Sequence, residues 1–437
     1  INSGTSMAAP HVAGGAALIL QKVDEEFGLT GKDRVRMAKN ILMNTAEAVL
    51  DKGDLNQILD FGVPYSPRRQ GAGLMKLHSA ISTPVVVTEE TTGEAKVALR
   101  EVGDTFSFTL TATNFGEEEV TYDVDANIQS DLQIFGVIGN AYYTGELDQL
   151  EAAFMEADIT INGGETSITI GAGETVTFDV EFDLSNARVF GFNDAGQPGF
   201  YSPEDLFPNG YFVEGFVTLT DQSDNNPQLS VPYVGFKGDW NAAPVLDELD
   251  YDGNDSFYEQ AGALYPAGEP GLYNYLGFDP FTGVKSSSSI AISPNTDSDQ
   301  DRIIPILSFL RNAKSVEYYI VDEEGNELRK LRTDLNVRKN YYDRGLGLPY
   351  RLDSSLYWDG TVNGKVVDEG QYYFEIRSTI DYPGKDAQVF SIPVQVDVTA
   401  PELAVEFNDG IVSIDASDNG SGIRYFEFLV NGDSLGI

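Results

Sequence analysis

The residues that could do chemistry in this chain gather at its beginning, in the stretch Ile-Asn-Ser-Gly-Thr-Ser-Met-Ala-Ala-Pro-His-Val-Ala-Gly. Small and apolar residues continue from Met7 to Val23, with no formal charge before Lys22, and this composition predicts a helix that is buried on all sides. Ser6 lies where that helix would begin, so its hydroxyl would meet free backbone N–H groups and the positive end of the helix dipole. The same groups can stabilise the oxyanion that forms when a hydroxyl attacks a carbonyl carbon.

A serine is a weak nucleophile by itself, and hydrolysis also needs a histidine base and a carboxylate that orients the histidine. Ser6 could otherwise be a plain helix cap. Gly4 permits an unusual backbone entry before the helix, and Pro10 is expected inside the first turn, where its missing N–H would remove no hydrogen bond. The chain contains two histidines, His11 and His78, and both are expected to pack within helices. His11 follows Ser6 by five residues, so it should point away from the hydroxyl.

The eleven residues from Gly4 to Gly14 resemble the serine box of the subtilisin-like serine proteases. The resemblance implies that Ser6 is the catalytic nucleophile and that its backbone N–H is one donor to the oxyanion. The chain order in that family is Asp, then His, then Ser, so the resemblance places both partners and the oxyanion Asn upstream of Ile1. We therefore expect the chain to be the C-terminal part of a longer serine endopeptidase and to be inactive alone.

Composition excludes several classes of function. The 437 residues are too many for one domain, and the absence of cysteine excludes disulfides, thiolate metal sites and a cysteine nucleophile. The net charge of −41 is carried almost entirely by residues 85–437, which disfavours nucleic acid and anionic lipid as partners. No apolar run is long enough for a membrane span. The resemblance implies protein or peptide substrates as partners, and the expected oligomeric state is a monomer.

The hydrophobic period changes from helical to alternating near Pro84. Val35, Ala38, Ile41 and Leu42 share one face of an amphipathic helix over 32–44. Alternating apolar residues then predict strands over 106–112, 120–124, 176–184, 212–219 and 229–234. These strands predict a β-sandwich, interrupted by a long loop over 185–210 and followed by an acidic connector over 239–290 with little core of its own. Further strands are predicted around 316–320, 371–376, 403–407 and 411–414, with a hairpin at Asn363-Gly364.

The resemblance extends along nearly the whole chain. The stretches Ser66–Leu74, Tyr211–Leu219 and Val231–Asn241 resemble the cell-envelope proteases of the same family. The resemblance implies a mixed fold, in which the C-terminal helices of an α/β subtilisin-like domain precede all-β fibronectin-III-like sandwiches. The expected domains are 1–84, the end of the catalytic domain; 85–240, a first fibronectin-III-like domain; 241–398, the connector and a second such domain; and 399–437, the start of another. The resemblance also implies a bacterial protein that is secreted or anchored in the cell wall.

One loop has the oxygen-rich pattern of a cation site. Asn295, Asp297, Asp299 and Asp301 place oxygen side chains at every second residue, an arrangement that can wrap a hard cation such as Ca²⁺. The loop does not meet the full EF-hand spacing, because, counted from Asp297, the sixth position has no glycine and the twelfth has no glutamate. The alternative is a solvated turn. No cofactor is expected for catalysis.

Two functions from different classes remain open. The leading hypothesis is peptide-bond hydrolysis by Ser6, and the alternative is a non-catalytic adhesion or spacer protein built of β-sandwich modules. If the chain belongs to a peptidase, the acidic first sandwich and the loop over 185–210 could favour cationic peptides by electrostatic steering.

Overall fold

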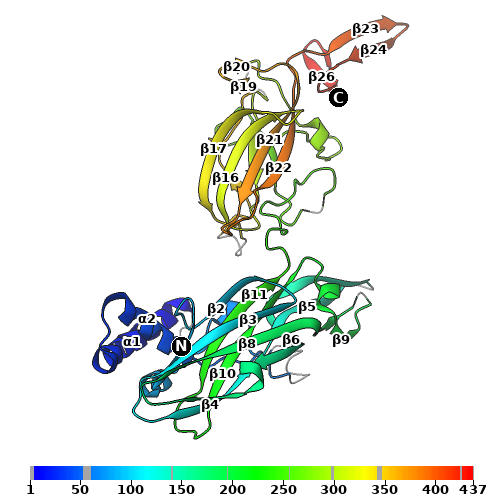
Figure 1. Ribbon diagram of the computed structural model, residues 1–437. Coiled ribbons are helices and arrows are strands. Elements are labelled where there is room, and N and C mark those ends of the chain that lie inside the picture. The colour runs from blue at the N-terminus through cyan, green and yellow to red at the C-terminus, as the bar shows by residue number, and fades with distance from the viewer. Residues whose placement is uncertain are drawn as a thin grey trace. The chain divides into compact units, whose positions relative to one another are not determined.

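The computed structural model describes residues 4–52, 61–138, 141–193, 195–254, 256–296, 300–341, 347–423 and 426–436. The chain divides into two compact units, Ile1–Ala242 and Ala243–Ile437 (Figure 1). Unit 1 contains a helical segment and a large sheet, and unit 2 is built of strands. The boundaries predicted within each unit stay predictions.

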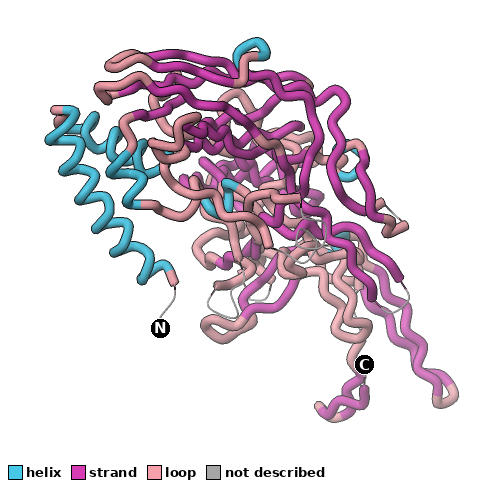
Figure 2. Tube along the Cα trace, turned by 90° about the horizontal axis from the view of Figure 1, so that it is seen from below, coloured by secondary structure: helices cyan, strands magenta, loops and turns pink. Residues whose placement is uncertain are grey.

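The helical segment of unit 1 begins with two helices that lie side by side (Figures 1 and 2). Its elements are α1 (Thr5–Lys22), the π-helical turn η1 (Val23–Phe27), α2 (Gly31–Asn44), α4 (Pro67–Gln70) and α5 (Leu77–Ser82). They enclose a small core of Ile19, Val23, Ala38, Ile41, Ala80 and Val86. Because Val86 belongs to the first strand of the sheet, the helices and the sheet share this core.

The prediction that the first helix is buried on all sides is wrong for its N-terminal half. Residues 4–14 are all exposed, and the side chain of Val12 is 50% exposed. In the described part of the chain, burial on α1 starts at Gly15 and includes Ile19 and Lys22. The apolar composition predicted a helix covered on every side, whereas the described residues cover only one side of its second half.

Other predictions about helix faces also need correction. Val35 was expected on the buried face of α2, but its side chain is 59% exposed. Asn40 and Asn44 are buried on α2 beside Ala38 and Ile41, because the sheet faces them. His11 and His78 were expected to pack, and both are exposed.

Unit 1 contains a sandwich of eleven strands in one continuous hydrogen-bonded network. The strands are β1 (Val85–Glu89), β2 (Val97–Val102), β3 (Thr105–Asn114), β4 (Val120–Ala126), β5 (Gln129–Ile138), β6 (Ala141–Ile161), β7 (Ser167–Ile170), β8 (Thr175–Phe192), β9 (Pro198–Tyr201), β10 (Tyr211–Asp221) and β11 (Leu229–Lys237). A 3₁₀ turn, η2 (Asn162–Gly164), follows β6. The order is β1-β3-β8-β6-β5-β10-β11-β2, with β4 on β10 and β7 on β4.

Strand β6 joins the two layers, since its first part pairs with β5 and its last part pairs with β8. The five strands predicted for this region correspond to β3, β4, β8, β10 and β11. Their inward residues, among them Leu110, Phe178 and Val231, form the core, so the alternating pattern predicted the buried face correctly.

The loop predicted over 185–210 is largely ordered structure. Strand β8 continues to Phe192, β9 pairs with it as a hairpin, and a short helix, α6 (Pro203–Leu206), follows. Val189 and Phe190 on β8 are buried, and so is Phe207 after α6. These buried side chains anchor the segment to the main core.

Unit 2 contains a five-stranded and a four-stranded sheet. Its elements are β12 (Gly262–Pro266), β13 (Tyr273–Tyr275), η3 (Ser287–Ser289), β14 (Ala291–Ile292), β15 (Ile304–Leu307), β16 (Ala313–Asp322), β17 (Glu327–Val337), β18 (Arg351–Leu352), β19 (Thr361–Val362), β20 (Lys365–Val366), β21 (Gly370–Thr379), β22 (Gln388–Val396), β23 (Glu402–Asn408), β24 (Ile411–Ser417), β25 (Phe428–Val430) and β26 (Asp433–Gly436). The sheet orders are β14-β22-β21-β16-β17 and β13-β12-β15-β18.

The prediction that residues 239–290 form a connector with little core of its own is wrong. Tyr251, Ala263 and Leu276 are buried, and β12 pairs with both β13 and β15. The hairpin predicted at Asn363-Gly364 is present between β19 and β20, and both turn residues have positive φ, 51° and 74°. None of the described helices has the length and apolarity needed to cross a membrane.

Candidate active site

Ser6 is the second residue of α1, and its side chain is exposed. Gly4 precedes the helix with φ of 129°, a conformation that glycine adopts without a steric penalty. The carbonyl oxygen of Gly4 accepts hydrogen bonds from the amides of Met7 and Ala8 at 3.0 and 3.2 Å. The amides of Thr5 and Ser6 come earlier still, where a helix offers no acceptor of its own. Ser6 therefore presents a hydroxyl and an amide at the positive end of the helix, in line with the sequence prediction.

The prediction that Pro10 lies inside the first turn, where it would remove no hydrogen bond, is wrong. The helix begins at Thr5, so Pro10 is its sixth residue and lies beyond the first turn. In an α-helix the N–H of residue 10 would donate to the carbonyl of residue 6. Because proline has no N–H, the carbonyl of Ser6 lacks its helical donor, and the turn that carries the serine is held by fewer hydrogen bonds.

Neither histidine serves Ser6 in the described structure. The Nδ1 atom of His11 lies 2.8 Å from the carbonyl oxygen of Met7, one turn back along the same helix. Five residues correspond to about 500° of rotation, so His11 points to a different side of α1 from Ser6. His78 is on α5 and is exposed. The base that a serine nucleophile requires is therefore not supplied by either of these residues.

The far end of the serine helix is firmly anchored. The Lys22 side chain is 7% exposed, and its ammonium donates to the carbonyls of Ile81 at 2.6 Å and Thr83 at 2.8 Å. Burial lowers the pKa of Lys22, and the carboxylate of Glu26 partly opposes this effect. Gly15 approaches the side chain of Met75 so closely that a Cβ there would lie 2.8 Å from its sulfur. Helix α1 is thus held by its second half and leaves the serine end open.

Two asparagines join α2 to the sheet. The side chain of Asn40 donates to the carbonyl of Gly93 at 2.9 Å and accepts from the amide of Ala95 at 3.1 Å. One turn later, Asn44 accepts from Val87 and donates to the carbonyl of Ser230 at 3.1 Å. The sequence carried a signal for them, since two asparagines four residues apart lie next to Ile41 on an otherwise apolar helix face.

The stretch Ser66–Leu74 holds the chain that leaves α2. The side-chain amide of Gln70 pairs with both backbone groups of Val49, accepting at 2.8 Å and donating at 3.3 Å. Glu47 and Leu74 exchange two backbone hydrogen bonds, at 2.9 and 2.8 Å. Gly73 has φ of 121°, and a Cβ at this position would lie 2.2 Å from the carbonyl oxygen of Glu47. This close approach explains why glycine is needed in the motif.

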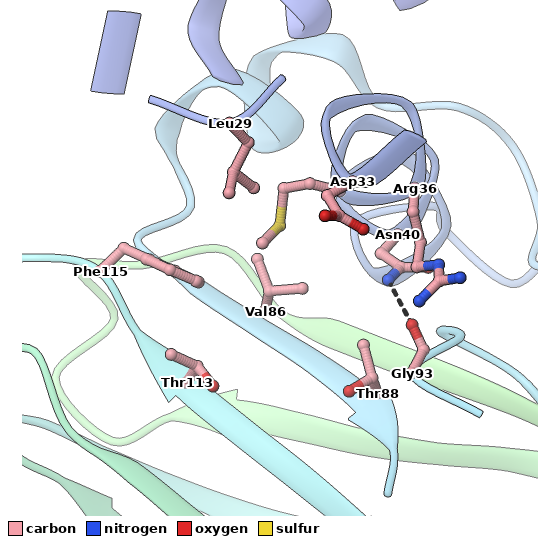
Figure 3. A pocket seen from close by; sticks show the side chains of 10 residues that line it. Leu29, Asp33, Arg36, Asn40, Val86, Thr88, Gly93, Thr113 and Phe115 are labelled. Carbon is pink, nitrogen blue, oxygen red and sulfur yellow. Dashed lines mark hydrogen bonds between the residues drawn. The ribbon is translucent and has the colours of Figure 1, made fainter. Parts of the chain in front are cut away.

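A hollow of about 200 Å³ lies between α2 and strands β1 and β3 (Figure 3). Leu29, Val86 and Phe115 give it an apolar wall, and Asp33 and Arg36 lie on the α2 side. The hydrogen bond from Asn40 to Gly93 crosses its margin. Ser6 does not line this hollow, which contains no paired nucleophile and base.

The predicted calcium loop is only partly described. Asp297 and Asp299 lie outside the described residues, whereas Asn295 and Asp301 are within them. The carboxylate of Asp301 accepts a hydrogen bond from the amide of Thr296 at 2.9 Å. Among the described residues, no three acidic, histidine or cysteine side chains form a metal-binding group. The calcium site stays a prediction.

Comparison with known proteins gives two family matches in different parts of the chain. Residues 1–73 match the model of the subtilase family, the part that contains Ser6, α1 and α2. Residues 97–234 match the model of an Fn3-like domain, the part that runs from β2 into β11.

Curated relatives match across both parts. The PI-type proteinase of Lactococcus lactis subsp. cremoris is 30% identical over 433 residues, covering 92% of this chain and 20% of that protein. The PII-type proteinase of Lacticaseibacillus paracasei has the same identity and coverage. The C5a peptidase of Streptococcus pyogenes serotype M1 is 28% identical over 469 residues, covering 92% of this chain and 36% of that protein. The chain therefore spans between a fifth and about a third of the length of these relatives.

Proposed function

This chain belongs to the subtilase family, in the group that contains the lactococcal PI-type proteinase and the streptococcal C5a peptidase, and we propose that it is the C-terminal part of a serine endopeptidase whose nucleophile is Ser6. The family resemblance and the mixed fold, subtilase helices followed by Fn3-like strands, are thereby confirmed. The catalytic role of Ser6, the substrates and the remaining triad residues belong to the proposal.

The observation that carries the proposal is the position of Ser6 at the amide end of α1, where it is exposed among the described residues, while the far end of the helix is anchored. A hydroxyl in this position can attack an acyl carbon, and the Ser6 amide can stabilise the resulting oxyanion. A histidine from a segment that precedes residue 1 would accept the hydroxyl proton and return it to the leaving amine. An aspartate from the same segment would orient that histidine.

The exposed half of α1 supports this arrangement. Met7 and Val12 are exposed apolar residues in this half, and the helix carries no formal charge before Lys22. A helix of this composition is normally covered on every side. We propose that the preceding catalytic segment covers this half and delivers the histidine to Ser6.

The proposed setting is the exterior of a bacterial cell. A protein without cysteine builds its domains from hydrophobic cores, and the net charge of −41 keeps it soluble and away from anionic surfaces. We propose a secreted or wall-attached monomer that cleaves proteins or peptides.

The test uses the full-length protein that contains this chain. The wild-type protein should hydrolyse casein and react at Ser6 with a fluorophosphonate probe, as seen by peptide mass spectrometry. The Ser6→Ala variant should lose at least about 10⁴-fold in kcat/KM, as expected when a triad nucleophile is removed. Residues 1–437 alone should not react with the probe.

The non-catalytic alternative predicts a different result. A spacer or adhesion protein would show no fluorophosphonate labelling in its full-length form, and Ser6→Ala would change nothing. Full activity in a correctly folded Ser6→Ala protein would also refute the proposed role of this serine.

A further inference from the structure

Arg68 forms an ion cluster with two buried carboxylates of the Fn3-like domain. Its Nε donates to Glu214 at 2.8 Å, and its Nη2 donates to Glu214 at 3.1 Å and to Asp131 at 2.5 Å. The guanidinium also lies 3.6 Å from the ring centroid of Phe212. Arg68 belongs to α4 in the helical segment, whereas Asp131 is on β5 and both Phe212 and Glu214 are on β10. The cluster therefore connects the two parts that match different families.

The two carboxylates of this cluster are withdrawn from water, and the Arg68 side chain is 21% exposed. The Glu214 side chain is fully buried and Asp131 is 6% exposed, so one guanidinium faces two sheltered carboxylates. Burial raises the pKa of Glu214, and the hydrogen bonds and charge of Arg68 oppose that effect only in part. A buried ion pair adds little net stability, but removing one partner leaves an uncompensated charge and is strongly destabilising. The cluster is thus suited to enforcing one placement of the two parts.

Other buried hydrogen bonds fasten the chain that precedes Arg68 to β5 and to β6. The side-chain amide of Gln129 donates to the carbonyl of Pro64 at 2.9 Å, and Gln129 is fully buried. The carboxylate of Asp51 accepts from the amide of Ala152 on β6 at 3.1 Å. Two residues that precede Arg68 along the chain, Asp51 and Pro64, are therefore also held against the sheet.

The residues next to Arg68 in the chain and in the cluster make further contacts in two directions. Towards the serine helix, Gln70 pairs with Val49 beyond α2, and Ile41 of α2 shares the small core with Ile19 of α1. In the other direction, the Phe212 ring lies 5.4 Å from Phe236 and 5.7 Å from Trp240 by centroids. The cluster thus lies between the serine helix and the end of the Fn3-like domain.

We propose that Arg68 is a positioning residue, which with Asp131 and Glu214 fixes the serine-bearing helices on the Fn3-like domain, so that this domain is a required part of the peptidase unit. The catalytic half of this inference rests on the proposed function. Its structural half concerns residues 1–242 alone, so the two can fail separately.

The structural half is tested on the 437-residue chain. The chain contains two tryptophans, so Trp358→Phe leaves Trp240 as the single fluorescent reporter of unfolding. Hydrogen exchange is measured separately over residues 31–50 and 64–74. Arg68→Met should speed exchange in both segments roughly 100-fold and shift the Trp240 unfolding transition to lower urea, as expected when a buried carboxylate loses its partner. Arg68→Lys keeps the positive charge but loses the planar guanidinium that donates to both carboxylates. It should therefore speed hydrogen exchange by a smaller factor, roughly tenfold.

Arg69→Met is the matched control. Arg69 is the next residue, is exposed and lies over the ring of Tyr65, so this variant should change exchange by no more than about twofold. Adding Glu214→Gln to Arg68→Met should recover part of the loss, because the orphaned carboxylate is then neutral. If Arg68→Met affects the helices but leaves the Trp240 transition unchanged, or affects neither, the inference is overturned.

The catalytic half is tested in the full-length peptidase with a short chromogenic peptide. Arg68→Lys should lower kcat at least threefold with KM unchanged, since the distant cluster does not touch substrate, and Arg69→Met should keep both values. An active wild type with a fully active Arg68→Lys variant would overturn the positioning role. An inactive wild type would refute the proposed function while leaving the exchange result to stand on its own.

Discussion

The side chain of Asn44 accepts a hydrogen bond from the backbone N–H of Val87 at 2.9 Å, joining the last residue of α2 to the first strand of the sandwich. The same side chain donates to Ser230 on β11, and Asn44 is fully buried. One amide therefore satisfies two backbone groups that are distant from each other in sequence, where water cannot replace it.

Replacing Asn44 with Ala should destabilise unit 1 by about 3 kcal/mol, because an amide and a carbonyl lose their partner in a buried site. Urea unfolding followed by Trp240 fluorescence in the Trp358→Phe background measures this loss. Asn225→Ala is the control, since Asn225 is exposed in the same unit, and it should change stability by less than about 0.5 kcal/mol. Equal effects of the two substitutions would contradict the bridging role.

Gly73 provides a prediction about the motif that follows the serine helices. A Cβ at Gly73 would collide with the carbonyl of Glu47, whereas one at Gly71 would meet nothing within 4 Å. Both glycines have positive φ, so both alanine variants carry conformational strain. We expect Gly71→Ala to cost about 1 kcal/mol and Gly73→Ala about 3 kcal/mol or more.

Hydrogen exchange at the amides of Glu47 and Leu74 measures the difference between the two glycine variants. Gly73→Ala should deprotect both amides, because it separates the two chain segments that these amides join. Gly71→Ala should leave them largely protected. If the two variants behave alike, the close approach at Gly73 is not what the motif requires.

The sandwich of unit 1 could be predicted because its signals are local. Phe108, Leu110 and Ala112 alternate with threonines on β3, and a period of two identifies both the strand and its buried face. The continuation of β8 could not be predicted in this way, because Ser185 and Asn186 interrupt the alternation. Its pairing with β6 and β9 supplies the missing information, and those partners are recognised only in the folded chain.

The candidate site was predictable to a similar extent. The short motif around Ser6 indicated a serine at the head of a helix, since glycine, serine and a following apolar run are local features. The consequence of Pro10 depended on one residue of helix register, which composition does not determine. The role of Arg68 depended on Asp131 and Glu214, whose contacts with it span 63 and 146 residues of sequence.

The loop around Asp297 carries a prediction that the sequence alone supports. If Asn295, Asp297, Asp299 and Asp301 bind calcium, a chelator should lower the melting temperature of unit 2, and added Ca²⁺ should restore it. Trp358 belongs to unit 2, so its fluorescence in a Trp240→Phe background is a suitable reporter. A double Asp297→Asn, Asp299→Asn variant should no longer respond to chelator. An unchanged melting curve in the unsubstituted chain would exclude the site.

Asp353 should make unit 2 sensitive to acid. Hydrogen bonds from Ser355 and the ion pair with Arg332, at 2.7 Å, lower the pKa of Asp353 to about 2. Because this pKa lies below the value of 3.8 in the absence of these partners, the stabilisation is fully present above about pH 4 and is lost as the pH falls towards 2.

Asp353→Asn should therefore destabilise unit 2 by about 1 kcal/mol at pH 7, an amount reduced by the partial exposure of the side chain, and by less at pH 2. Thermal unfolding followed by Trp358 fluorescence across pH 2–7 measures the difference. Asp381→Asn removes an exposed carboxylate that pairs with Lys314 and should leave the pH profile unchanged. A loss of stability in Asp353→Asn that is the same at pH 2 and pH 7 would show that the carboxylate charge is not what stabilises this turn.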